Sequence, residues 1–429
     1  MPLFDADTLA DWLQHLEGLH PSAIDMGLAR VAAVRDALGL TPSFPVLTVA
    51  GTNGKGSVCA MLSSMFRAAG YKVGTYTSPH LLEYNERVRI NMQPADDAEL
   101  VASFRAIETA RGETTLTYFE FGTLAAMRQF IDAGVDVAIM EVGLGGRLDA
   151  VNVFDPDVAG VVSIDLDHQS YLGDTREAIG AEKAGIFRAG KPALCADPDP
   201  PQSVIDVAAR VGAPLQLVGR DFGFMKEGEG NQWMFWGAQG KHHALPIPAL
   251  RGSYQMGNAT LAIAMLDEVR SQLPVGIGDI KRGLLEVEWP ARCQVLPGRP
   301  QTVLDVAHNP HAARALRLAL DQMGYAAKTH AVFGAMGDKD IGGVVSALAD
   351  RIDHWYLAAP QLPRAAPVEQ LQTAVLQTAP QALTSAYGSV EQAWKAACEQ
   401  AAETDRILVF GSFYTVAEVM AAQHGNGSR

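Results

Sequence analysis

The most constraining stretch of this sequence is Val46–Ser57, which reads VLTVAGTNGKGS. A β-prone run ends at Ala50, a loop with three glycines and one lysine follows, and a helical pattern begins at Val58. Strand, glycine loop and helix in this order are typical of a phosphate-binding loop. Glycine lets backbone N–H groups approach phosphate oxygens, while the helix N-terminus and Lys55 add positive charge.

The loop departs from the strict phosphate-loop pattern at one position. That pattern ends in Gly-Lys-Ser/Thr, and the residue directly after the lysine gives its hydroxyl to Mg²⁺. Here Gly56 stands between Lys55 and Ser57, so the hydroxyl must come from Ser57 or from elsewhere. The alternative interpretation is a glycine-rich turn without a ligand, which the lysine and the flanking strand and helix disfavour.

Length and charge limit the possible functions. The chain has 429 residues, which is too long for one ordinary domain and predicts two. Its net charge of −14 argues against general binding to nucleic acid or to a membrane surface, but allows an anionic substrate in a local basic site. Four cysteines without metal-ligand spacing, and no signal-like N-terminus, predict free thiols in the cytoplasm. No apolar run is long enough to predict a membrane span.

Polar residues follow two further predicted strands. The strand Tyr71–Thr77 is followed by Ser78, and a strand over residues 136–141 ends at Glu141, before the glycine-rich segment Val142–Ala150. Ligands of open α/β sheets bind at the carboxyl ends of strands, so both side chains are candidate site residues. A carboxylate beside a phosphate loop favours a Mg²⁺ ligand over an ordinary strand end. For Ser78, a capping serine in a solvated loop is the alternative.

His168 and Lys183 are weaker candidates on pattern alone. Val158–Ile164 is predicted as the next strand, and His168 follows it in a loop. A single loop histidine is often only hydrogen-bonded, but its position at a strand end keeps a ligand role open. Lys183 lies in a helix predicted to end near Gly185, where a lysine is ordinarily exposed or ion-paired.

The remaining N-terminal segments are predicted from periodicity. Asp7–Leu40 and Asp97–Arg111 have helical patterns, and Thr117–Phe121 leads into another helix. The segment from Pro198 to Gly240 is less regular, with short strands expected around Trp233 and Trp236.

The Pro/Gly cluster Pro297–Pro300 marks the predicted domain boundary, giving domains 1–296 and 297–429. From Gln301 onward strands and helices alternate, which predicts a small parallel sheet. Asp305 and His308 follow the strand Val303–Val306, where a ligand would lie; a capping aspartate and a structural histidine are the alternative. The predicted fold class is α/β: an N-terminal P-loop-type mononucleotide-binding ATPase domain and a smaller C-terminal Rossmann-like parallel-sheet domain.

Taken in order, these motifs resemble the bifunctional dihydrofolate synthase/folylpolyglutamate synthase family of Mur-ligase-like ATP-dependent amide ligases. One departure is Ala291, where the family often has glycine; we expect only a local backbone adjustment. The matching stretches extend over almost the full chain: Leu19-His20, Ile24–Leu28, Gly51–Ser57, Thr77–Leu81, Glu86–Arg89, Thr117–Glu120, Glu141–Asn152, Asp167-His168, Glu182–Ile186, Tyr254-Gln255, Asn258-Ala259, Trp289–Arg292 and Asp305–Pro310.

The resemblance implies a ligase that joins L-glutamate to dihydropteroate, giving dihydrofolate, and to reduced folates, giving polyglutamates. ATP phosphorylates a carboxylate, and the amine of L-glutamate then attacks the acyl phosphate. Positioning and charge neutralisation by two Mg²⁺ ions, a lysine and backbone N–H groups suffice, so no covalent nucleophile is needed. A cytoplasmic monomer with small-molecule substrates, and without nucleic-acid or membrane partners, is expected.

The resemblance also assigns a role to each motif residue. A catalytic set of Lys55, Glu141, His168 and Lys183 is implied, with Lys183 carbamylated because a carbamate offers oxygen ligands where an ammonium repels cations. Ser78, Glu141 and His168 would bind metal, which resolves the missing hydroxyl after Lys55. The ATP site would comprise Thr52, Asn53, Gly54, Lys55, Gly56, Ser57, Asn258, Arg292, Asp305 and His308. The pterin site would comprise Ile24, Asp25, Met26, Gly27, Thr117, Tyr118, Phe119, Glu120, Leu148, Asp149 and Ala150.

Three alternatives remain open. A monofunctional folylpolyglutamate synthase would use the same machinery on reduced folates alone, although the Ile24–Leu28 segment favours the bifunctional enzyme. A Mur-type peptidoglycan ligase usually has an extra N-terminal domain, and about 45 residues before the first strand leave no room for one. A non-catalytic nucleotide-binding regulator would need the phosphate loop without Glu141, His168 and Lys183.

Overall fold

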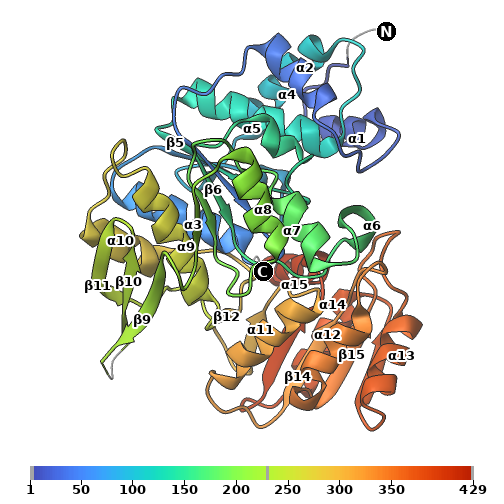
Figure 1. Cartoon of the computed structure of the whole chain (residues 1–429). Helices are drawn as coiled ribbons and strands as arrows, with labels where there is room; N and C mark the ends of the chain where they lie inside the picture. The colour runs from blue at the N-terminus through green and yellow to red at the C-terminus, as the bar shows by residue number, and fades with distance from the viewer. Residues whose placement is uncertain (1–3, 229–230, 427–429) are drawn as a thin grey trace. The chain divides into compact units, whose positions relative to one another are not determined.

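The computed structural model describes residues 4–228 and 231–426, which form two compact units (Figure 1). The first unit comprises Met1–Ala249 and Met256–Val287, and the second comprises Leu250–Gln255 and Glu288–Arg429. The predicted boundary after residue 296 falls inside the second unit. There, β12 (Gln294–Leu296) pairs antiparallel with β13 (Gln301–Leu304), so the Pro/Gly cluster is the turn of a hairpin rather than a linker.

An eight-stranded sheet in the order β4-β3-β2-β5-β1-β6-β7-β8 organises the first unit. The six strands β2, β5, β1, β6, β7 and β8 run parallel to one another. The strands β3 and β4 extend the sheet beyond β2, each antiparallel to its neighbour. The four central strands are buried along their whole length, as expected for a parallel sheet covered on both faces. The strands are β1 (Val46–Ala50), β2 (Val73–Tyr76), β3 (Val88–Ile90), β4 (Gln93–Pro94), β5 (Val137–Glu141), β6 (Val158–Val161), β7 (Ala193–Cys195) and β8 (Leu215–Leu217).

Several helices of this unit begin at side-chain caps. Thr8 and Thr175 each accept a hydrogen bond from a backbone N–H of the first turn, and Thr117 and Glu120 form a capping box. The predicted helix over Asp97–Arg111 and the helix after Thr117 are confirmed. The helices are α1 (Leu9–Leu19), α2 (Ala29–Leu38), α3 (Lys55–Ala68), α4 (Asp97–Arg111), α5 (Tyr118–Ala133), α6 (Gln169–Leu172), α7 (Arg176–Ala184), α8 (Gln202–Val211), α9 (Gln255–Glu268) and α10 (Ile277–Glu286), with 3-10 helices η1 (Tyr84–Arg87) and η2 (Ala150–Val153).

The segment predicted as irregular contains more structure than expected. The helix α8 was missed because prolines at 198, 200 and 201 lead into it, and Pro201 is its N-cap residue. Beyond it, β9 (Gly223–Glu227), β10 (Gln232–Gly237) and β11 (Gly240–Pro246) form a three-stranded antiparallel sheet. The strand expected around Trp233 and Trp236 is confirmed as β10. Within the described ranges, no helix is long and apolar enough to cross a membrane.

The second unit has a six-stranded sheet in the order β12-β13-β17-β14-β15-β16. All neighbours except β12 and β13 pair parallel, which confirms the predicted Rossmann-like alternation. Asn309 caps α11 and Pro310 takes its first turn, where the missing N–H costs nothing. The other elements are β14 (Thr329–Phe333), β15 (His354–Ala358), β16 (Leu383–Tyr387), β17 (Arg406–Phe410), α11 (Pro310–Asp321), α12 (Ile341–Leu348), α13 (Val368–Thr378), α14 (Val390–Gln400) and α15 (Phe413–Asn426), with the 3-10 helix η3 (Ala349–Arg351).

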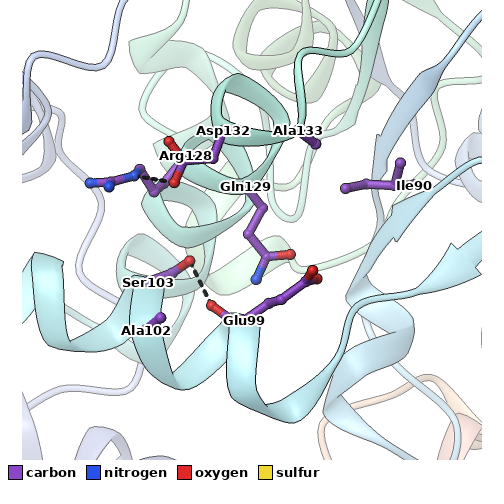
Figure 2. Close-up of a pocket in the computed structure, with 8 residues that line it drawn as sticks. All are labelled: Ile90, Glu99, Ala102, Ser103, Arg128, Gln129, Asp132 and Ala133. Atoms are coloured by element: carbon purple, nitrogen blue, oxygen red, sulfur yellow. Dashed lines mark hydrogen bonds and ion pairs between the residues drawn. The ribbon is translucent and has the colours of Figure 1, made fainter.

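A small pocket of about 260 Å³ lies between α4, α5 and β3 in the first unit (Figure 2). Figure 2 shows the carboxamide of Gln129 directed into this pocket, toward Glu99. Gln129 is 5% exposed, and both its Oε1 and its Nε2 lack a hydrogen-bond partner among the described residues. A buried polar group without a partner loses its hydration and gains nothing in return.

We therefore predict that Gln129→Met raises the free energy of unfolding by about 1–2 kcal/mol, because an apolar side chain of similar shape removes the uncompensated amide. Urea denaturation of purified protein measures the change. Gln216→Met is the matched control: the Gln216 Nε2 donates to Glu268 Oε1 at 2.7 Å, so this variant should lose stability. A loss for Gln129→Met as well would mean that water in the pocket satisfies the amide.

Candidate active site

The phosphate loop is attached by hydrogen bonds to the segment that follows the neighbouring strand β6. The Thr52 N–H donates to Ser163 O at 2.7 Å, and the Asn53 N–H donates to Ser163 Oγ at 3.2 Å. Thr52 Oγ1 donates to Asp165 O at 3.1 Å and accepts from the Asp165 N–H at 3.0 Å. Hydrogen bonds to the segment after β6 therefore hold the loop in shape.

Gly54 occupies a position that other residues cannot take without strain. Its φ of +89° is in the left-handed region, and a Cβ would lie 2.6 Å from Asn258 Oδ1. Asn258, on α9, therefore lies directly against the phosphate loop, although about 200 residues separate the two in sequence. Asn258 was predicted to bind ATP together with the phosphate loop, and the two lie next to each other.

Lys55 begins α3 and folds back over the loop. Its Nζ donates to Gly51 O at 3.0 Å and to Thr52 O at 3.3 Å. Ser57 is buried in the first turn of the same helix. The ammonium and the first N–H groups of α3 thus lie at one place, where an anionic phosphate would be stabilised.

Ser78 and Glu141 follow adjacent parallel strands, β2 and β5, and are in contact. The Ser78 N–H donates to Glu141 Oε2 at 3.1 Å, and Glu141 is only 5% exposed. A hydroxyl and a carboxylate are hard oxygen donors, which suit Mg²⁺. The two residues expected to bind Mg²⁺ thus lie side by side.

His168 has a left-handed backbone, with φ of +51°, at the N-cap position of α6. Its N–H donates to Asp167 Oδ1 at 2.9 Å, and its Nε2 lies 4.0 Å from the same oxygen. Across residues 4–228 and 231–426, no group of three or more His, Cys, Asp or Glu side chains gathers as a metal site.

Lys183 lies on α7 and is almost completely buried, at 4% exposure. Burial, together with the positive charge of Lys55, lowers the pKa of its amine to about 7, while Asp167 and Asp149 oppose the shift. A large fraction of the amine is therefore neutral near pH 7. The neutral amine is the form that reacts with carbon dioxide to give a carbamate.

Arg30 joins two of the predicted pterin segments. Its Nη1 donates to Asp25 Oδ2 at 2.7 Å, and its Nη2 donates to Glu120 Oε1 at 3.1 Å. The other oxygen of Glu120 accepts from the Thr117 N–H at 2.7 Å within the capping box of α5. Thr117 and Glu120 thus also have a structural role, as the capping box at the start of α5.

Two other predicted pterin residues, Phe119 and Met26, lie against the loop after β5. The ring of Phe119 packs against Gly143, where a Cβ would lie 2.7 Å from Phe119 Cζ. Met26 approaches Gly145 in the same way, with its Cε 3.7 Å from the position of a Cβ. Tyr118 lies 5.4 Å from the Arg87 guanidinium, and Ile24, Gly27 and Leu148 are half-buried.

Asp149 holds the loop after β5 in shape. Its carboxylate accepts from the Leu144 N–H at 2.8 Å and from the Val151 N–H at 3.0 Å, directly before the buried Ala150. Burial raises the pKa of this carboxyl to about 7, although these backbone N–H groups favour its charged form.

In the second unit, Arg292, Asp305 and His308 form one cluster. The Arg292 guanidinium lies 5.2 Å from the Phe413 ring, and the His308 ring lies 6.1 Å from it. The Asp305 carboxylate accepts from the Cys293 and Ala307 N–H groups, each at 2.8 Å. Burial raises the pKa of Asp305, and the charge of Arg292 opposes that rise. His308 Nδ1 donates to Val306 O at 2.8 Å, which directs Nε2 away from the backbone.

The backbone conformation of Ala291 is one that favours glycine, the residue that the family often has at this position. Its φ is +58°, the left-handed conformation in which glycine has no steric cost, and its side chain is fully buried. Its carbonyl accepts from the Val306 N–H at 3.1 Å, so the conformation is tied to the segment that carries Asp305.

We predict that Ala291→Gly leaves the free energy of unfolding within about 1 kcal/mol, because relief of the left-handed strain offsets the lost methyl. Ala291→Val should lose about 3 kcal/mol, since a β-branched residue rarely adopts this φ and the side chain is fully buried. Ala313→Val, at a buried helical position, is the control for overpacking alone. Equal losses for the two valine variants in urea denaturation would contradict the backbone argument.

Sequence reasoning missed three residues that organise the site. Ser163 fixes the phosphate loop, Asp167 lies close enough to affect the amine of Lys183, and Arg30 joins the pterin segments. Ser163 and Asp167 come directly after β6, so the strand-end argument that selected His168 could have selected them too. Arg30 had no such signal, because a helical arginine is usually exposed.

Comparison with known proteins identifies close relatives. Residues 49–266 match the Mur ligase middle domain, and residues 291–413 match the Mur ligase glutamate ligase domain. The chain is 45% identical to the dihydrofolate synthase/folylpolyglutamate synthase of Escherichia coli K12, over 97% of this chain and 95% of that protein.

Two solved structures are similar over nearly their whole length. One is E. coli FolC in complex with DHPP and ADP, with a TM-score of 0.93, 45% identity and 99% of each chain covered. The other is a bifunctional folylpolyglutamate synthase/dihydrofolate synthase with Mn, AMPPNP and L-glutamate bound, with a TM-score of 0.90, 45% identity, and 98% of this chain and 100% of that chain covered.

Proposed function

This chain belongs to the dihydrofolate synthase/folylpolyglutamate synthase family of Mur-type ligases, and we propose that it joins L-glutamate to dihydropteroate and to reduced folates at the expense of ATP. The observation that carries the proposal is the arrangement along one sheet edge. At the carboxyl ends of adjacent strands lie the phosphate loop and the Ser78–Glu141 pair, and the buried Lys183 lies close to the loop. The chain is also 45% identical to a dihydrofolate synthase/folylpolyglutamate synthase.

The reaction begins with transfer of the ATP γ-phosphoryl group to the substrate carboxylate. Lys55 and the N–H groups of the phosphate loop hold the phosphates and stabilise the charge that spreads over the transferred group. The amine of L-glutamate then attacks the acyl carbon, the carbon–oxygen bond to phosphate breaks, and the amine loses a proton. Amide, ADP and phosphate are the products.

Divalent metal supports this chemistry by neutralising phosphate charge when bound. We assign Ser78 and Glu141 to one Mg²⁺, and Glu141 and His168 to a second. The hydrogen bond from the half-buried Ser78 to the buried Glu141 places the two residues side by side and supports the first assignment, and the structures of relatives with Mn support divalent metal use. Asn258, Arg292, Asp305 and His308 complete the proposed nucleotide set, and the bridge by Arg30 supports the two segments around Asp25 and Glu120 as the pterin site.

The test is phosphate release from ATP and Mg²⁺ with L-glutamate, measured without acceptor, with 7,8-dihydropteroate and with a reduced folate. We expect turnover with both acceptors, and mass spectrometry should find each product heavier by one glutamate residue. Glu141→Gln should lower both rates by about 100-fold or more, because it removes a charged metal ligand. Turnover with the folate alone would establish a monofunctional folylpolyglutamate synthase, and no acceptor-dependent turnover would overturn the proposal.

We also propose that Lys183 is carbamylated. The folded protein lowers the pKa of this amine from 10.5 to about 7. Below that pH the amine is mostly protonated and does not react with carbon dioxide, and above it the amine is mostly neutral and reacts. At constant carbon dioxide pressure, ¹³C-carbamate at Lys183 should therefore increase several-fold between about pH 6 and pH 8, well below the range of exposed lysines. NMR with ¹³C-labelled carbon dioxide measures this, and Lys183→Ala should lack the signal. A signal that rises only above about pH 9 would contradict the shifted pKa.

A further inference from the structure

The loop after β5 is bound tightly to the last turn of α7, which carries Lys183. The Arg147 N–H donates to Glu182 O at 2.8 Å. The Arg147 side chain returns to the same residue, with Nε at 3.0 Å and Nη2 at 2.7 Å from Glu182 Oε1. Backbone and side chain of Arg147 thus both bind the residue directly before Lys183.

Two glycines let the loop and the helix come this close. A Cβ on Gly146 would lie 2.8 Å from Glu182 O and 3.1 Å from Lys183 Cα. A Cβ on Gly185 would lie 2.3 Å from Arg147 Cβ. The backbone of the loop is therefore in contact with the backbone of Lys183 itself, and no side chain separates them.

Asn152 closes the arrangement from the other side. Its Nδ2 donates to Arg147 O at 2.9 Å and to Gly185 O at 3.1 Å, so a single amide joins the loop to the end of α7. Its Oδ1 accepts from Arg188 Nη2 at 2.9 Å, which fixes the orientation of the amide. Every polar atom of the Asn152 amide group that faces this junction has a partner.

We propose that the Arg147–Glu182 pair and Asn152 are positioning residues that set the place of Lys183 in the ligase reaction. This inference rests on the proposed function. The pair itself is a weak contributor to stability, because the Arg147 side chain is 56% exposed and the Glu182 side chain 20% exposed. Its role is geometric: it holds the α7 backbone at Lys183 against the loop that follows Glu141.

Steady-state kinetics of Arg147→Ala and Glu182→Ala test the proposal in the full-length protein. We expect kcat to fall about 10- to 100-fold, because small displacements of a catalytic group cost this much. The Mg²⁺ concentration for half-maximal rate should rise, the KM for ATP should stay within about twofold, and the melting temperature within about 3 °C. The ¹³C-carbamate signal of Lys183 should weaken or shift. The double variant Arg147→Glu/Glu182→Arg should recover part of kcat.

The control is Arg128→Ala, which removes an exposed arginine–carboxylate pair on α5, with 2.5 Å between Arg128 Nε and Asp132 Oδ2. It should leave kcat unchanged. Wild-type kinetics and an unchanged carbamate signal in Arg147→Ala would overturn the positioning role. If the wild-type protein itself lacks acceptor-dependent turnover, the proposed function fails, and the carbamate signal still decides whether this junction positions Lys183.

Discussion

The parallel pairing of β2, β5, β1 and β6 is the constraint on which the first unit depends. Parallel strands end at the same edge of a sheet, so the segments that follow these four strands are forced together. That edge receives Ser78, Glu141, the phosphate loop and the Ser163–His168 segment without any local sequence similarity among them. Hydrogen bonds across neighbouring strand ends, from Ser78 to Glu141 and from Thr52 to Ser163, then hold the loops in place. Chemistry at this edge follows from strand order rather than from any single motif.

Electrostatics at this edge is dominated by two lysines with different surroundings. Lys55 donates to carbonyls of its own loop, which stabilise its charge, whereas Lys183 is buried and close to Lys55. Burial is the main cause that lowers the pKa of the Lys183 amine, and repulsion from the half-buried Lys55 adds to it. Asp149 and Asp167 partly compensate. Conversion of Lys183 to a carbamate would change a repelled cation into an anion and so relieve the repulsion from Lys55.

The sequence was sufficient for most of the fold because the strongest signals are local. Helical patterns predict Asp97–Arg111 and the helix after Thr117, apolar runs predict buried strands, and all of these are present. The helix α8 was missed because prolines precede it, and the domain boundary was misplaced because a Pro/Gly turn in a hairpin has the composition of a linker. For the site, Arg30 had no signal of its own, because it joins two segments from a helix position where an arginine is usually exposed.

Glycine is required for two different structural reasons in this chain, and the sequence alone does not distinguish them. Gly54 is required by its backbone angle and by the approach of Asn258, while Gly146 and Gly185 are required because two backbones touch. Ala291 has a left-handed φ without being glycine, which places a steric cost beside Arg292 and Asp305. A strained residue persists only when its surroundings determine its conformation. Here the Ala291 carbonyl accepts from the Val306 N–H, and the Ala291 N–H donates to Gln294 Oε1. The surroundings likewise hold the backbone at Lys183: Glu182 and Gly185 accept hydrogen bonds from the loop after β5 and from Asn152, and Gly146 lies against the Lys183 backbone.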